Sequence, residues 1–133
     1  IPIDSRHYWW VKNPKRAVDE INQMLNSTDS TFYFDNGKLI WEVEFTNNFG
    51  TYFLITIETD SNYPFTAPKV FVKEPKITKS KHVWGDESLC LFHPNEYSSR
   101  MTILDIRNLA ASWAFCYDAY EETSEWPGAE APH

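Results

Sequence analysis

The hydrophobic pattern of this chain changes its period near residue 31, and this change constrains the fold more than any other feature. Between residues 14 and 26 apolar side chains recur every three or four positions, whereas from 31 to 73 they alternate with polar ones. The first spacing lines one face of an α-helix, and the second lines one face of a β-strand. The chain therefore predicts a helix followed by a sheet. The apolar face of the helix consists of Ala17, Val18, Ile21, Met24 and Leu25.

The bounds of this first helix are marked by residues that favour helix ends. Asn13 suits the N-cap, and Pro14 suits the first helical position because a helix start leaves that amide hydrogen unbonded anyway. The run from Asn26 to Ser30 consists of residues that favour turns. These signals predict a helix over residues 14–26.

Three antiparallel strands are predicted next, joined by tight turns. The segments Thr31–Phe34, Leu39–Phe45 and Tyr52–Glu58 are rich in aromatic and β-branched residues, and they are separated by the hairpin signals Asp35-Asn36-Gly37 and Asn47-Asn48-Phe49-Gly50. The middle strand has Leu39, Trp41, Val43 and Phe45 on one face and Ile40, Glu42 and Glu44 on the other. We expect the first face to pack under helix 14–26 and the second to be mostly solvated.

A proline-containing turn, a fourth strand and a long helix complete the predicted elements. Pro64 and Pro68 lack amide donors, so their segment forms a turn, and a short strand from Val70 to Val72 ends at Pro75. Thr102 and Asp105 form a variant of the capping box at the start of a helix over about residues 103–122. Its apolar stripe consists of Ile103, Ile106, Leu109, Ala110, Trp113, Ala114, Tyr117 and Tyr120. Cys116 belongs to or borders this stripe, which predicts a buried core cysteine.

Composition limits the class of protein. A chain of 133 residues with 42% apolar residues can bury one core, so we expect a single domain over residues 1–133. No apolar run approaches the roughly 20 residues of a membrane helix, which predicts a soluble, cytoplasmic protein with no membrane partner. The net charge of −7 argues against a nucleic-acid partner. The lysine-rich stretch from Lys73 to Lys81 is interpreted as a solvated loop or as a docking edge for an acidic partner.

The number and spacing of the cysteines and histidines do not indicate a disulfide scaffold or a zinc site. Two cysteines are too few for a disulfide scaffold, and the four histidines lack the short spacings that zinc sites use. We therefore predict no metal and no other cofactor.

Cys90 is the strongest candidate for a reactive residue. It lies in the irregular stretch between the fourth strand and the last helix, together with His82, His93 and Asn95. A thiol on a loop between rigid elements is better placed for nucleophilic chemistry than for core packing, so we expect it to be solvent-accessible at the mouth of a shallow groove. A hydrolase with a Cys–His dyad is a weaker interpretation, because no glycine-rich oxyanion turn accompanies Cys90.

Three motifs in this region resemble those of ubiquitin-conjugating enzymes. They are Tyr63-Pro64-Phe65-Thr66-Ala67-Pro68-Lys69-Val70-Phe71-Val72, then Ser88-Leu89-Cys90-Leu91, then Tyr97-Ser98-Ser99-Arg100-Met101-Thr102-Ile103, and the match covers residues 63–106. In that family a similar Tyr-Pro-Phe strand leads to an Ile-Cys-Leu active site and a Trp-Ser-Pro helix start. The resemblance implies a UBC-like α+β fold with an N-terminal helix, a four-stranded antiparallel meander, an active-site loop and a long C-terminal helix. It also implies that Cys90 forms the thioester.

The chain departs from that family at one motif. In ubiquitin-conjugating enzymes a His-Pro-Asn motif precedes the cysteine by eight residues, and its Asn is the hydrogen-bond donor that stabilises the oxyanion. His82 stands at that distance, eight residues before Cys90, while a His-Pro-Asn triplet occurs downstream as His93-Pro94-Asn95. In this respect the chain is similar to bacterial relatives found in cyclic-oligonucleotide antiphage signalling (CBASS) operons, which also close on Trp-x-Gly-x-Glu-x-x-His, here Trp126 to His133. This resemblance implies an adenylating, activating-type enzyme as one partner. It implies the C-terminus of a ubiquitin-like protein or of a cyclic-nucleotide synthase as the group carried.

The roles of the polar residues around the thiol stay open between alternatives. His82 is either a donor to the thioester oxyanion or base for the incoming amine, or a loop histidine bonded to solvent or backbone. His93 and Asn95 either support the site or only fix the exit of the loop. His133 either reaches the cysteine or is a frayed terminal residue.

The function that the resemblance favours is a ubiquitin-conjugating-like acyltransferase. It accepts a protein C-terminus on Cys90 as a thioester and passes it to an amine, in bacterial antiphage defence. The alternative is a non-catalytic, UBC-like protein-binding module whose cysteine is vestigial.

Overall fold

The computed structural model describes residues 7–77 and 82–127. The first predicted helix is confirmed as α2 (Pro14–Ser27), and the side chain of Asn13 caps it by accepting a hydrogen bond from the amide of Arg16. A one-turn helix that the sequence did not predict, α1 (Trp9–Lys12), precedes it. Trp9 of α1 is buried and donates its indole hydrogen to Oγ1 of Thr59, at 2.9 Å, so this turn is tied to the sheet.

The four predicted strands are confirmed as an antiparallel meander in the order β1-β2-β3-β4. They are β1 (Asp29–Asp35), β2 (Lys38–Thr46), β3 (Tyr52–Thr59) and β4 (Lys69–Glu74). Asn36 and Gly37 form the two-residue turn between β1 and β2, with φ values of 51° and 76°. Asn and Gly tolerate positive φ better than other residues, which is why this pair closes a tight hairpin.

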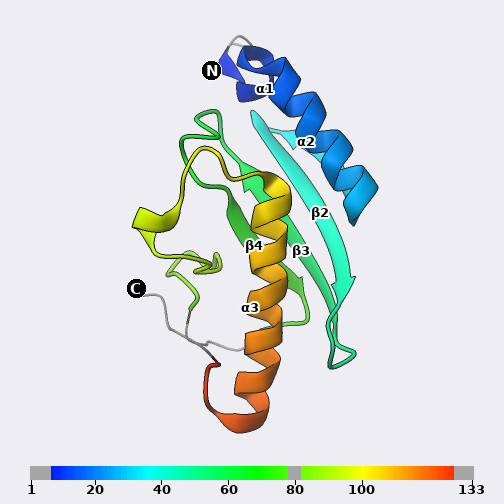
Figure 1. Cartoon of the computed structure of the whole chain (residues 1–133), viewed down its shortest axis with the longest axis vertical. Coiled ribbons are helices and arrows are strands. Elements are labelled where there is room, and N and C mark those ends of the chain that lie inside the picture. Colours follow the sequence, from blue (N-terminus) through cyan, green and yellow to red (C-terminus); the bar gives the residue numbers. More distant parts are fainter. Residues whose placement is uncertain (1–6, 78–81, 128–133) are drawn as a thin grey trace.

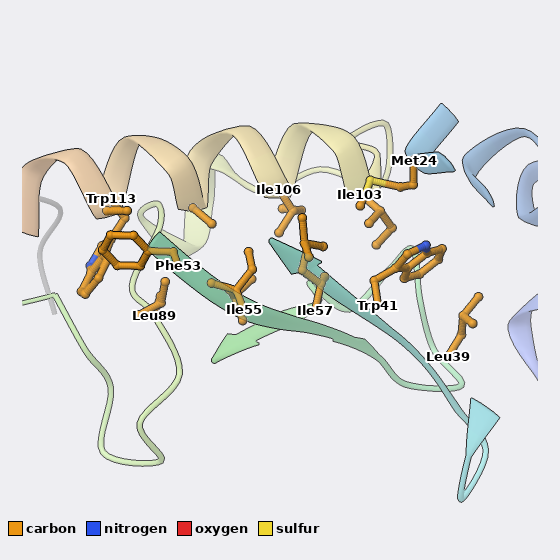
Figure 2. Close-up of a cluster of buried hydrophobic side chains, with 14 of the residues drawn as sticks. Met24, Leu39, Trp41, Phe53, Ile55, Ile57, Leu89, Ile103, Ile106 and Trp113 are labelled. Carbon is orange, nitrogen blue, oxygen red and sulfur yellow. The ribbon is translucent and has the colours of Figure 1, made fainter. Parts of the chain in front are cut away.

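The core lies between the sheet and α3 (Ile103–Thr123), which crosses one face of the sheet (Figures 1 and 2). The prediction that helix 14–26 covers this face is therefore wrong for most of it: Ile103, Ile106 and Trp113 of α3 lie over β2 and β3, and α2 contributes Met24 next to Ile103. The capping box of α3 is confirmed, with Thr102 and Asp105 bonded to each other's backbone amides at 3.2 and 3.0 Å.

The faces of two elements differ from the sequence pattern. Val18 and Leu25 of α2 are exposed although they belong to its predicted apolar face. Ile40 is buried although it was placed on the solvated face of β2, where its cross-strand neighbours are Tyr33 and Glu58.

A buried carboxylate joins α2 to the turn after β3 and to the start of α3. Glu20 is 3% exposed and accepts hydrogen bonds from Nε of Arg16 (3.0 Å), the hydroxyl of Tyr63 (2.7 Å) and the amide of Ile103 (2.6 Å). A buried charge is tolerated only when it is paired and hydrogen-bonded in this way. This network fixes both ends of the stretch in which Cys90 lies, since Tyr63 precedes it and Ile103 follows it.

No helix among the described residues is long and apolar enough to span a membrane. That residues 1–133 form one domain stays a prediction.

Candidate functional site

Cys90 lies at the end of a small hairpin between β4 and α3. The hairpin, residues 82–90, is closed by a β-bridge between Val83 and Leu89 and by a hydrogen bond from the amide of Trp84 to the carbonyl of Ser88, at 2.8 Å. At its open end the amide of Cys90 donates to the carbonyl of His82, also at 2.8 Å. We call residues 82–90 the Cys90 hairpin. Because the chain folds back in this hairpin, His82 and Cys90 are in contact although they are eight residues apart in sequence.

The Cys90 hairpin is attached to the body of the protein on two sides. On one side the amide of Leu89 donates to the carbonyl of Val70 in β4, at 2.9 Å. On the other side the buried indole of Trp113, from α3, donates to the carbonyl of His82 at 3.2 Å. The hairpin is thus held between the last strand and the long helix.

The acidic tip of the hairpin is neutralised by a lysine. Nζ of Lys69 lies 2.7 Å from Oδ2 of Asp86, and Ser88 donates to the same carboxylate through its amide and its hydroxyl. These contacts hold the pKa of Asp86 well below its usual range. Asp86 is therefore a carboxylate that belongs to the hairpin's own structure.

Cys90 as a whole residue is 4% exposed, so the prediction that it is solvent-accessible is wrong. Its position outside helices and strands is confirmed, but docking of the hairpin onto β4 and α3 covers it, and this covering depends on contacts that are distant in sequence. Burial raises the pKa of the Cys90 thiol, because the thiolate loses solvation. The thiol is accordingly protonated at neutral pH.

Cys116 is more accessible than Cys90, which reverses the expected order. It is only partly buried, so the prediction of a fully buried core cysteine is also wrong, although it does border the apolar stripe of α3. Its Sγ donates a weak hydrogen bond to the carbonyl of Pro127, 3.8 Å away.

His82 lies beside Cys90 through the backbone, and its side chain is 3% exposed. The imidazole packs against the indole of Trp126, with ring centroids 4.4 Å apart. The φ of His82 is 68°, in the left-handed region that residues other than Gly seldom adopt. His82 is therefore fixed at both its backbone and its ring.

The other predicted polar residues have structural partners of their own. His93 caps the short 3₁₀-helix η2 (Pro94–Glu96): its Nδ1 accepts a hydrogen bond from the amide of Asn95 at 3.2 Å, and Glu96 accepts one from the amide of His93 at 2.9 Å. The side chain of Asn95 is exposed. A supporting role of His93 and Asn95 in catalysis stays a prediction. His133 lies outside the described residues.

A cavity of about 690 Å³ lies beside the Cys90 hairpin. Leu89 and Leu91, on either side of Cys90 in sequence, line it, whereas Cys90 itself does not. The remaining lining residues come mainly from the turn before β4 and from the hairpin: Phe65, Thr66, Ala67, Pro68, Lys69, Trp84, Gly85, Asp86, Ser88, Phe92 and Tyr97. A cavity is thus present next to the candidate nucleophile, but Cys90 does not line it.

Within residues 7–77 and 82–127 no group of His, Cys, Asp and Glu side chains could hold a metal ion. The absence of a metal or cofactor in the functional protein stays a prediction.

Comparison with known families gives the decisive finding. A model of the Type II CBASS E2 protein family matches residues 18–133. The chain belongs to this family. Membership confirms the resemblance drawn from the motifs, and the α+β architecture agrees with the UBC-like fold. It implies an E2-like role in conjugation in antiphage defence, with E1-like and cyclase components as partners. No curated protein matches the chain.

Two residues that contact His82 were missed by sequence reasoning as parts of the site. Trp113 was assigned only to the packed stripe of α3, and Trp126 only to the closing motif of the chain. The target of the Trp113 indole is a backbone carbonyl, which leaves no signal in the sequence.

Proposed function

We propose that this Type II CBASS E2 protein carries the C-terminus of another protein as a thioester on Cys90 and transfers it to an amine. The carried protein is a ubiquitin-like protein or a cyclic-nucleotide synthase, and an adenylating enzyme supplies it in activated form. The single observation that supports this most is the backbone hydrogen bond from the amide of Cys90 to the carbonyl of His82, because it brings the candidate nucleophile next to the residue that stands at the sequence distance of the family's stabilising Asn.

Each step of the proposed reaction exchanges one bond to the carried acyl carbon. In loading, Sγ of Cys90 attacks the C-terminal carbonyl of the donor thioester, a new S–C bond forms, and the donor's sulfur leaves with the proton that the Cys90 thiol gives up. In discharge, an amine attacks the same carbon, an N–C bond forms, and Sγ leaves and is reprotonated. Both steps form an oxyanion, and we assign the ring of His82 as the hydrogen-bond donor to the one formed in discharge, when the amine attacks the thioester.

Because Cys90 is buried, its thiol must be exposed or deprotonated before it can react. A protonated, covered thiol reacts slowly with small electrophiles, since the thiolate is the nucleophile. The proposed reaction therefore needs a bound donor that exposes Cys90 or accepts its proton. Such a requirement reserves the cysteine for its partner proteins.

The test is adduct formation with the adenylating enzyme and cyclase encoded in the same operon, in the presence of ATP. We expect a covalent adduct that reductant releases, that is lost in Cys90→Ala and that is retained in Cys116→Ala. Cys90→Ser is expected to trap a more stable ester. An adduct that persists in Cys90→Ala, or that is lost only in Cys116→Ala, would place the chemistry on the other cysteine.

One observation favours a second candidate function, a non-catalytic binding module. Both Cys90 and His82 are nearly fully buried, at 4% and 3% exposed. For this candidate the partners bind with the same affinity to the native protein and to Cys90→Ala, and ATP yields no reductant-sensitive adduct.

A further inference from the structure

Trp113 shares a hydrogen-bond acceptor with Cys90. The carbonyl oxygen of His82 accepts the amide hydrogen of Cys90 at 2.8 Å and the indole hydrogen of Trp113 at 3.2 Å. A carbonyl oxygen has two lone pairs, so it can satisfy both donors. The long helix and the backbone of the candidate nucleophile are thus joined through one atom.

The position of Trp113 is itself rigid. Its side chain is 4% exposed, and its ring stacks on that of Tyr117 one turn further along α3, with centroids 5.1 Å apart. α3 is anchored at its start by the capping box and by Glu20, and it covers the core (Figure 2). Because packing fixes the position of the indole, its hydrogen bond constrains the position of the hairpin.

The contact falls on a residue of the hairpin that has a strained backbone conformation. His82 has a φ of 68°, in the left-handed region that is unfavourable for residues other than Gly. Its ring is held by Trp126 and its carbonyl by Trp113. Without the indole hydrogen bond, the hairpin would lose this polar contact with α3, while the hydrogen bond from Leu89 to β4 would remain.

We propose that Trp113 is a positioning residue for Cys90: its indole hydrogen bond to the carbonyl of His82 holds the Cys90 hairpin against α3 and so sets the placement and the burial of the thiol. The consequence for the reaction rests on the proposed function, but the consequence for the exposure of the thiol does not. Trp113 acts through the hairpin and does not itself touch the reacting atoms.

The test compares two tryptophans that each donate one buried indole hydrogen bond. In a Cys116→Ser background, the rate of alkylation of Cys90 by iodoacetamide is measured for the parent, for Trp113→Phe and for Trp9→Phe. Trp9 is the matched control because it is as buried as Trp113 and its indole bonds to Thr59, in the sheet. Replacement of Trp113 by β-(3-benzothienyl)alanine, which keeps the shape of the ring without the N–H, covers the case in which Trp113→Phe fails to fold.

We expect loss of the Trp113 hydrogen bond to increase the alkylation rate of Cys90 roughly two- to tenfold, the factor that a typical net hydrogen bond gives for a local opening. The alkylation pH profile should also move to lower pH, as a less buried thiol ionises more readily. Trp9→Phe should change neither. Equal alkylation in the parent and in both Trp113 variants, or equal acceleration by Trp9→Phe, would overturn the proposal.

A second readout connects the hairpin to the reaction. With the adenylating partner and ATP, adduct formation by Trp113→Phe should show a lower kcat at an unchanged KM, since the partner surface is intact and only the thiol is misplaced. If no variant and no parent forms an adduct, the proposed function fails while the alkylation comparison still decides the role of Trp113.

Discussion

Cys90 combines a covered thiol with a raised pKa, and these two properties decide how it reacts when its partners are absent. Burial favours the neutral thiol, so a smaller fraction of thiolate is present at any given pH than for a solvated cysteine. Cys116 also has a raised pKa but is less covered. The two cysteines therefore differ mainly in access.

Native alkylation should accordingly label Cys116 before Cys90. We expect iodoacetamide to modify Cys116 faster at neutral pH, and the rate at Cys90 to keep rising with pH above the value at which an unfolded cysteine reaches its plateau. Mass spectrometry of the two peptides after timed labelling measures both rates, and urea-unfolded protein, in which both cysteines react alike, is the control. Faster native labelling of Cys90 would show that the hairpin does not cover it.

The role assigned to the ring of His82 is to donate a hydrogen bond to the oxyanion formed in discharge. A substitution that removes only the ring tests this role. His82→Gly removes the ring and suits the positive φ, so it relieves the backbone strain that alanine would retain. If the ring donates to the oxyanion, discharge should slow by about a hundred- to thousandfold while loading changes little. Single-turnover loading and discharge, measured separately, provide the test.

Two variants control this experiment. His82→Asn retains a donor in a residue that tolerates left-handed φ, so it should recover part of the discharge rate. His93→Ala removes a histidine that caps η2 and should leave discharge near that of the parent. An unchanged discharge rate in His82→Gly would remove His82 from the mechanism.

At the scale of elements, the meeting of α2, the turn after β3 and the start of α3 depends on one buried carboxylate. Glu20 accepts hydrogen bonds from groups 43 and 83 residues further along the chain, in Tyr63 and Ile103. This contact shows why a helical apolar pattern identifies only part of the buried face, since Ala17 and Met24 are buried as the pattern predicts. Glu20 is inside because its partners come from other elements, while Val18 and Leu25 stay outside.

Glu20→Gln is expected to destabilise the fold strongly. The neutral amide leaves the guanidinium of Arg16 without its charged partner and cannot accept all three hydrogen bonds, and breaking a buried pair typically costs about 3–5 kcal/mol. Urea unfolding followed by circular dichroism measures the loss. The matched control is Asp19→Asn in the exposed i, i+4 pair with Lys15, one residue earlier on the same helix, where little change is expected. Equal effects of the two substitutions would contradict the account of the network.

Local signals in the sequence were sufficient to predict α2, the four strands and α3, but not the one-turn helix α1. Asn13-Pro14 marks the start of α2, Asn36-Gly37 the first hairpin, and Thr102 with Asp105 the start of α3. They were not sufficient for packing between elements. That α3 rather than α2 covers most of the sheet, and that Cys90 is buried, follow from contacts between distant segments, such as Leu89 with Val70 and Trp113 with His82.

At the scale of the whole molecule, the chain has a UBC-like architecture with its candidate nucleophile held between β4 and α3. β4 supports one side of the Cys90 hairpin and α3 the other (Figure 1), and the cavity beside it is lined by residues that flank the thiol. The family assignment agrees with this arrangement and supplies the context of antiphage conjugation. The proposed mechanism requires that Cys90 carries the transferred group.

Peptide mapping of the loaded protein identifies the residue that carries the transferred group. The wild-type chain is incubated with the adenylating enzyme, the cyclase and ATP, the reaction is quenched at low pH without reductant, and the digest is analysed by mass spectrometry. We expect the peptide containing Cys90 to carry the C-terminal residues of the donor through a bond that reductant and hydroxylamine both cleave, and the peptide containing Cys116 to be unmodified. Attachment to Cys116, or to a lysine with no thioester at any time point, would contradict it.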